Sequence, residues 1–196
     1  MDSNCAAQQK MCTGDKVVVA ARKLFAERGF HQTAMADLAQ EAQVSVGAIY
    51  RVFASKQDII EAIIVTDTSR ILSELTRHVG RVRDGEAQIG AVLEEIMLRA
   101  CVEKDTALIQ EILAEGHRNP RVAEIIREVH VQYRAIFREM ATVANPDLSD
   151  MELAGAEELL LACLFSAGHR ELTGPSLNIA ETVSILSRLI VRALRS

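Results

Sequence analysis

The segment from Thr33 to Lys56 constrains the fold more than any other part of this chain. Its apolar residues recur at the helical spacing i, i+3, i+4, i+7 in two successive runs. These are Met35, Leu38, Ala39 and Ala42, followed by Val46, Ile49, Tyr50 and Phe53. Ser45 lies between the runs and is a good N-cap for the second helix. Helices this short do not persist alone in water, so the spacing predicts two helices packed against a third element.

The amphipathic run before this segment can supply the third helix. It is predicted to start at Thr13 or Asp15, and Gly29 is the residue expected just past its end. Its apolar face is Val17, Val18, Ala21, Leu24 and Phe25. The last of the three helices leaves only small residues and one cation uncovered, which is the shape that enters a DNA major groove.

In length and spacing, this region resembles the N-terminal domain of the tetracycline-repressor (TetR) family of transcriptional regulators. The matching residues are Ala20, Ala21, Leu24, Phe25, Gly29, Phe30, Thr33, Leu38, Ala39, Val44, Ser45, Gly47, Tyr50, Phe53 and Lys56. Two positions depart from the family pattern. Gln43 stands where the turn usually has glycine, and a left-handed conformation costs more for Gln than for Gly. Val52 stands where an aromatic residue or histidine is common, and it removes one phosphate contact.

The candidate DNA contacts follow from position and from the resemblance. Residues at the start of a recognition helix reach base edges, and Arg51 is expected on a phosphate in preference to a guanine. The resemblance implies backbone contacts from Thr33, Tyr50 and Lys56; the alternative is that Tyr50 belongs to the core and Lys56 is merely solvated. The complete predicted set is Thr33, Ala36, Ser45, Val46, Gly47, Ala48, Tyr50, Arg51 and Lys56.

The charge of the chain divides between its two parts. Residues 1–60 hold seven Lys/Arg and six Asp/Glu, a net charge of +1, whereas residues 61–196 hold fifteen and twenty-one, a net charge of −6. The acidity therefore belongs to the C-terminal part, and the proposed DNA-binding part is locally neutral to basic. Phosphate binding depends on that local field more than on the total charge.

Composition favours an all-α protein, and the apolar periodicity along the chain predicts about nine helices. The 196 residues include three prolines and ten glycines, and a chain of this length buries a core without a metal or a disulfide. We expect a mobile tail, a helix-turn-helix domain, a linking helix, and an effector-binding and dimerisation domain. Their predicted ranges are 1–12, 13–55, 56–79 and 80–196. The N-terminus is polar, and no apolar run reaches the roughly 18 residues of a membrane span, so a cytoplasmic protein without membrane contact is expected.

The C-terminal part shows no catalytic or metal-binding constellation, so neither an enzyme nor a cofactor is predicted. Cys101 and Cys163 lie in apolar helices and are interpreted as small core residues, with a redox-sensing role as the less favoured alternative. The resemblance implies a small-molecule pocket among the middle helices, although an ordinary core explains the same residues. The pocket candidates are Met97, Cys101, His117, His130, Tyr133, Phe137, Phe165 and His169.

The helix predicted from Leu153 to Leu172 is apolar on more than one face, as expected of a helix buried on two sides. The resemblance implies that it forms a four-helix dimer interface together with the last helix. The predicted interface residues are Leu160, Leu164, Val183, Leu186 and Ile190. A single large monomeric core is the alternative.

These expectations together describe a ligand-responsive transcriptional regulator, most simply a repressor. It would bind double-stranded operator DNA as a homodimer and be released by a small apolar or amphipathic effector. Two alternatives stay open. One is a helical protein that binds a small molecule or a partner and has lost DNA binding; the other is an activator of the same fold.

Overall fold

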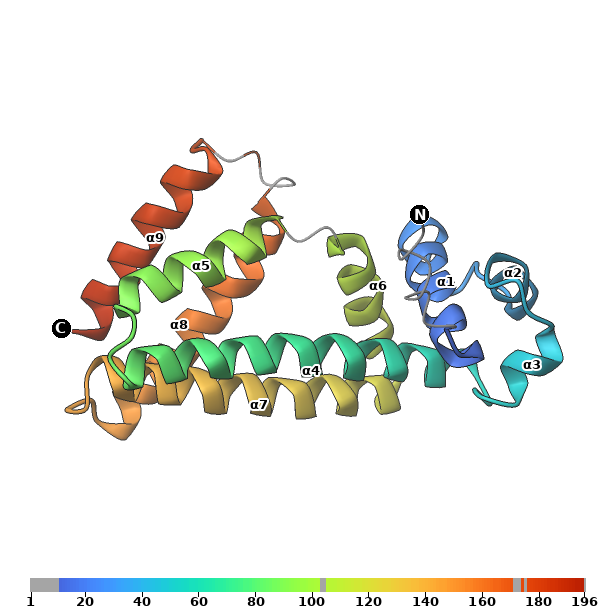
Figure 1. Cartoon of the computed structure of the whole chain (residues 1–196), viewed down its shortest axis with the longest axis horizontal. Coiled ribbons are helices and arrows are strands. Elements are labelled where there is room, and N and C mark those ends of the chain that lie inside the picture. Colours follow the sequence, from blue (N-terminus) through green and yellow to red (C-terminus); the bar gives the residue numbers. More distant parts are fainter. Residues whose placement is uncertain (1–10, 103–104, 171–173, 175, 196) are drawn as a thin grey trace, which may run out of the picture. The chain divides into compact units, whose positions relative to one another are not determined.

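The computed structural model describes residues 11–102, 105–170, 174 and 176–195. Within those residues the structure is all-helical, as predicted (Figure 1). The helices are α1 (Thr13–Arg28), α2 (Met35–Glu41), α3 (Val46–Tyr50), α4 (Lys56–Arg83), α5 (Ile89–Val102), α6 (Thr106–Gly116), α7 (Pro120–Ala144), α8 (Asp150–Gly168) and α9 (Ile179–Leu194). None of these helices combines the length and apolarity needed to cross a membrane. The first ten residues of the predicted tail lie outside the described part.

The chain forms two compact units that interleave in the sequence. The first comprises residues 1–66 and 107–125, and the second comprises residues 67–106 and 126–196. Both α4 and α7 therefore contribute residues to each unit. The predicted ranges 13–55, 56–79 and 80–196 describe functional regions and remain predictions. The return of residues 107–125 to the first unit was not anticipated.

In the first unit, α1, α2 and α3 pack on one another around a small apolar core. Helix α1 begins with a capping box in which the Asp15 N–H donates to the Cys12 thiol and the Cys12 N–H donates to the Asp15 carboxylate. It ends at Gly29, whose φ of 83° suits glycine. Phe30 then turns back and meets Phe25 edge-on at 5.2 Å between ring centroids. The predicted three-helix core is confirmed.

The first unit also contains α6 and the start of α7. Leu108 of α6 and Val122 of α7 are buried. Arg121, near the start of α7, pairs with Asp58 at 2.8 Å and Glu61 at 2.5 Å on the first turns of α4. These charged groups are partly exposed, so each pair contributes little to stability by itself. The pairs nevertheless join segments about 60 residues apart in the sequence.

The second unit has a larger core, in which α5 packs on both α8 and α9. Helix α8 begins with the predicted capping box, in which Ser149 and Glu152 each accept the other's backbone N–H. On its flank, Arg134 and Arg138 of α7 pair with Glu158 at 2.6 Å and Glu157 at 2.8 Å. Among the helix ends, α7 matches the expected range, α4 continues one turn beyond Val79, and α8 ends at Gly168 before the expected Leu172. Leu172 itself lies outside the described residues.

Candidate nucleic-acid interface

The turn between α2 and α3 is formed by a residue in a left-handed conformation. Gln43 has a φ of 55°, and among the described residues it alone combines a positive φ with a side chain larger than glycine's. Its N–H donates to the carbonyl of Gln40 at 3.2 Å, and the N–H of Val44 donates to the carbonyl of Ala39 at 3.0 Å. The backbone geometry thus supports the interpretation that glycine would adopt this left-handed conformation with less strain than Gln43.

Helix α3 is capped at one end and anchored through one buried side chain. Ser45 accepts the N–H of Ala48 through its hydroxyl at 3.1 Å, which confirms the predicted N-cap. Ile49 is completely buried and holds the helix on the three-helix core. Because α3 has only five residues, this cap and this anchor determine its placement.

The outer surface of α3 carries the predicted base-contacting residues. Val46 is 38% exposed and Tyr50 is 54% exposed, so Tyr50 is not a core residue. At Gly47, no described atom lies within 4 Å of the place where a Cβ would stand, so the backbone there is open to a close approach. Arg51, the C-cap residue, is exposed, as is Ala36 near the start of α2. Exposed apolar side chains gathered on so short a helix indicate a contact surface.

Thr33 does not belong to this exposed surface. Its exposed fraction is zero, and its hydroxyl donates to the carbonyl of Gly29 at 2.9 Å and approaches that of Leu24 at 3.4 Å. A buried hydroxyl with these partners closes the end of α1 and cannot reach a phosphate. We therefore remove the Thr33 side chain from the candidate contacts.

Lys56, at the start of α4, is also turned inward. Its ammonium donates to the carbonyls of Phe30 at 2.7 Å and Thr33 at 2.8 Å, and it lies 4.5 Å from the centroid of the Phe30 ring. Burial lowers the pKa of Lys56, and the nearby carboxylate of Glu115 partly offsets that effect. This lysine organises the loop between α1 and α2. A phosphate could meet only the remaining N–H of its ammonium.

Val52 is the second residue that departs from the family pattern. It is half exposed, and its Cγ1 lies 3.4 Å from where a Cβ on Gly14 would stand. The side chain therefore covers the first turn of α1. Unlike a tyrosine or histidine side chain, it offers no polar group to a phosphate.

The structure brings most of the predicted effector-pocket residues together in the second unit. Met97, Cys101, Tyr133 and Phe137 are buried in its core, and Phe165 packs against that core. His130 meets Phe165 edge-on at 5.3 Å, and the Nδ1 of His169 lies 2.7 Å from the Phe165 carbonyl. Burial raises the pKa of the Cys101 and Cys163 thiols, which disfavours the reactive thiolate.

His117 differs from the rest of that group. It is exposed and falls within the segment 107–125 of the first unit. The resemblance implies His117 as a polar point of the pocket, but the structure assigns it to a different compact unit. We therefore separate it from the pocket candidates.

The predicted dimer residues require a larger correction. Leu160, Val183 and Ile190 are buried in the core of their own chain, at 1%, 6% and 2% exposure, and Leu164 and Leu186 are only partly exposed. The exposed large apolar residues of α8 and α9 are instead Met151, at 85%, Leu159, at 36%, and Leu189, at 54%. The predicted residues therefore lie mainly on the core-facing sides of α8 and α9, and the dimer interface itself stays a prediction.

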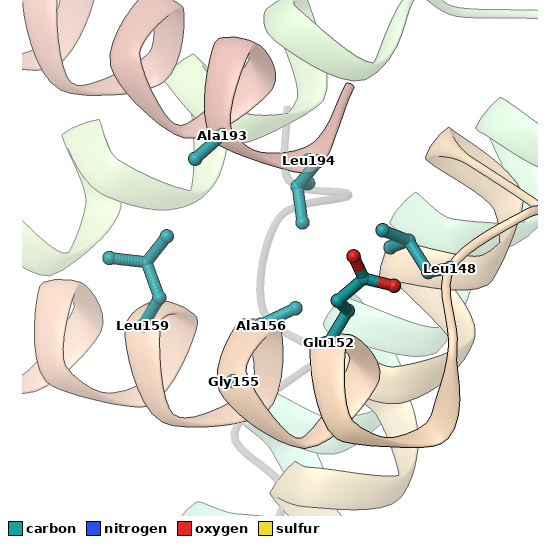
Figure 2. A pocket seen from close by; sticks show the side chains of 7 residues that line it. All are labelled: Leu148, Glu152, Gly155, Ala156, Leu159, Ala193 and Leu194. Carbon is teal, nitrogen blue, oxygen red and sulfur yellow. The ribbon is translucent and has the colours of Figure 1, made fainter. Parts of the chain in front are cut away.

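A groove lies on this outward surface, between the first half of α8 and the end of α9 (Figure 2). It has a volume of about 200 Å³ and is lined by Leu148, Glu152, Gly155, Ala156, Leu159, Ala193 and Leu194. Apart from Glu152 the lining is apolar and consists of three leucines and three small residues, which suits close packing of another helix. In the described part of the chain, no three His, Cys, Asp or Glu side chains are grouped so as to hold a metal ion.

The fold and the exposed α3 define a helical protein with an N-terminal helix-turn-helix, and comparisons with known proteins agree. Residues 17–63 match the family described as "Bacterial regulatory proteins, tetR family". The chain is 31% identical over 119 residues to the HTH-type transcriptional regulator UidR of Escherichia coli. That match covers 61% of this chain and 59% of UidR, so it spans about three fifths of the relative's length.

Two further similarities extend over most of the chain. The HTH-type transcriptional repressor Rv3405c of Mycobacterium tuberculosis is 28% identical over 186 residues, covering 88% of this chain and 89% of that protein. The solved structure of Salmonella enterica GusR superposes with a TM-score of 0.76 at 26% identity, covering 97% of this chain and 99% of GusR. Residues 17–63 thus correspond to the N-terminal region of the tetR family, and the comparisons together support a regulator of that family.

Proposed function

We propose that this chain is a cytoplasmic one-component transcriptional regulator, most simply a repressor. It binds operator DNA as a homodimer and is released by a small apolar or amphipathic effector. The observation that carries the proposal is the surface of α3, where Val46, Gly47 and Tyr50 are exposed while Ile49 fixes the helix from below. The names of UidR and Rv3405c, a transcriptional regulator and a transcriptional repressor, support it.

DNA recognition combines shape, apolar contact and one cation. Small side chains at the start of α3 allow the helix to approach base edges closely, so thymine methyl groups and the local DNA shape carry much of the discrimination. Ser45, Ala48 and Ala36 flank this contact, and Tyr50 and Arg51 lie at the exposed end of α3, within reach of the phosphate backbone.

The dimer forms through the outward surfaces of α8 and α9. The exposed Leu159 and Leu189 and the groove beside them support this arrangement, since one subunit's apolar side chains can enter the groove of the other. Two copies then place their α3 helices about one helical turn of DNA, roughly 34–36 Å, apart or a multiple of it.

The effector is proposed to bind in the second unit, beside Tyr133, Phe165, His130 and His169. Their apolar surroundings favour a ligand with a substantial apolar part, and the two imidazoles offer polar contacts. A coupling free energy of only about 1–3 kcal/mol between this region and the helix-turn-helix changes operator affinity by up to roughly two orders of magnitude.

A gel-shift titration tests the proposal, using the DNA upstream of the protein's own gene and several salt concentrations. The expected result is a shift whose affinity falls steeply with salt, because phosphate contacts release counterions. Absence of a shift even at low salt would favour a regulator-like protein that binds a small molecule or a partner without DNA. Transcription from the same fragment, with and without protein, separates repression from activation.

A further inference from the structure

The short loop between α1 and α2 is held by side chains from two distant helices. From one side, Lys56 of α4 donates to the carbonyls of Phe30 and Thr33. From the other, Glu111 of α6 accepts the N–H of Phe30 at 2.9 Å, across 81 residues of sequence. Both polar groups of the Phe30 backbone are therefore bound by charged side chains.

A second carboxylate one turn further along α6 approaches the same loop. The Oε2 of Glu115 lies 3.1 Å from the Nε2 of His31, an ion-pair distance without the alignment of a hydrogen bond. Glu115 is buried, and its Oε1 accepts from the Asn119 side chain at 3.2 Å. Burying a carboxylate is costly unless it has partners, so α6 is closely fitted to this loop.

The Glu111 carboxylate also packs close over Gly29, the residue that ends α1. A Cβ on Gly29 would stand 3.2 Å from the Glu111 carboxylate, and Gly29 also has a positive φ. Met35, the first residue of α2, follows Thr33 by two positions. A displacement of the loop would therefore pass directly to α2 and, through the Gln43 turn, to α3.

We propose that Glu111 is a positioning residue for DNA binding. Its carboxylate fixes the peptide N–H of Phe30 and thereby the loop from which the helix-turn-helix starts. This inference rests on the proposed function. It assigns to α6 a part in operator affinity without any contact between α6 and DNA. The segment 107–125 is thus part of the DNA-reading apparatus and more than a connection between helices.

The test compares Glu111→Ala and Glu111→Gln with the wild type, using a duplex that the wild-type protein selects from a random DNA pool. Glu94→Ala, an exposed carboxylate on α5, removes the same charge from the second unit and serves as the matched control. Each variant is first shown by circular dichroism to be folded at the assay temperature. Fluorescence anisotropy then gives the affinity at several salt concentrations, and hydrogen exchange reports on the Phe30 amide.

We expect Glu111→Ala to weaken binding of the selected duplex about tenfold, because a charge-assisted hydrogen bond is lost. The salt slope should stay unchanged, since no phosphate contact is removed. The Phe30 amide should exchange faster. Glu111→Gln keeps a carbonyl acceptor and should stay within about threefold of the wild type, and Glu94→Ala should match the wild type.

Several results would overturn the inference. It fails if Glu111→Ala binds as tightly as the wild type although the Phe30 amide exchanges faster, because the hydrogen bond then serves stability alone. It also fails if Glu111→Gln is as weak as Glu111→Ala, since the charge would then matter more than the position of the acceptor. A wild type that selects no duplex would overturn the proposed function, and the inference with it.

Discussion

One backbone angle sets the geometry of the turn before α3. Gln43 adopts a φ of 55°, where the Cβ of an L-residue crowds its own backbone. Glycine would avoid this crowding, although the unfolded chain would then have more freedom to lose. The turn therefore forms with Gln43, but its backbone is more strained than it would be with glycine at this position.

Replacing that residue should stabilise the protein. Gln43→Gly is expected to raise the free energy of unfolding by about 1 kcal/mol, the net of relieved strain and added unfolded-state entropy. Urea denaturation measures the change. Gln132→Gly, at an exposed position within α7, is the matched control and should lower stability by about the same amount. A loss of stability in Gln43→Gly would show that the turn does not strain the residue.

Arg51 and Lys56, two basic residues near the exposed surface of α3, should respond to substitution in different ways. Arg51→Ala should weaken binding to all sequences alike and reduce the salt slope by about one, because it would remove the proposed phosphate contact. Lys56→Ala should lower the free energy of unfolding by roughly 2 kcal/mol, since the carbonyls of Phe30 and Thr33 lose a charged donor. Salt-dependent anisotropy and urea titration separate the two. A reduced salt slope in Lys56→Ala would return this lysine to the DNA contacts.

The buried phenol of Tyr133 should make the free energy of unfolding fall as the pH rises in the alkaline range. Burial raises the pKa of its phenol to about 12, because the charged phenolate is poorly solvated in the core. The folded state therefore favours the neutral form, so this contribution is complete below the unfolded pKa of about 10 and is lost as the pH rises toward 12.

Between about pH 9.5 and 11.5, the wild type should lose about 2 kcal/mol more stability than Tyr133→Phe, which has no proton to release. Urea titrations at closely spaced pH values would show the difference. Parallel pH profiles for the two proteins would mean that the phenol is well solvated.

At this scale, sequence reasoning succeeded where the cause is local. The Ser45 cap followed from its place between two apolar runs, and the left-handed turn at Gln43 followed from the resemblance, which implies glycine there. The inward positions of the Thr33 and Lys56 side chains could not be predicted from the sequence, because the fold brings their partners to them. No local pattern indicated that Lys56 would meet Phe30 or that Glu111 would reach the same residue.

At the scale of helices, the apolar periodicity predicted the elements well, because each core-facing stripe is a property of one segment. It could not orient α8, whose three consecutive leucines leave several faces apolar. Leu160 and Leu161 point into the chain's own core, whereas Leu159 faces outward. Which of the three leucines is buried depends on where α5 and α9 pack, and the sequence of α8 alone does not show this.

The outward surface of α8 and α9 makes a specific prediction about assembly. Leu189→Glu should convert the proposed dimer to a monomer, because it places a carboxylate at an apolar interface without a partner. Light scattering after size-exclusion chromatography gives the mass. Val131→Glu, which alters an apolar residue on α7 that is more exposed than Leu189, should leave the mass unchanged. A dimeric Leu189→Glu variant would exclude this surface as the interface.

For the whole molecule, the proposed symmetric dimer imposes a spacing on its operator. The two halves of the site should be related by a twofold axis, at a separation fixed by the protein. Inserting about five base pairs between them turns one half to the opposite face of the duplex. Binding should then fall to the nonspecific level in a gel shift. Changing the same central base pairs without altering the length is the control. Unchanged affinity after the insertion would argue against simultaneous DNA binding by the α3 helices of both subunits.

The interleaving of the two units has a consequence for anyone who builds chimaeric regulators from this protein. A fusion that takes residues 1–66 and attaches a foreign sensor would leave behind Leu108 and Val122, which complete the apolar core of the first unit. It would also leave behind the α6 carboxylates beside Phe30 and His31. A transplantable DNA-reading module has to carry residues 107–125 as a second, separately grafted piece.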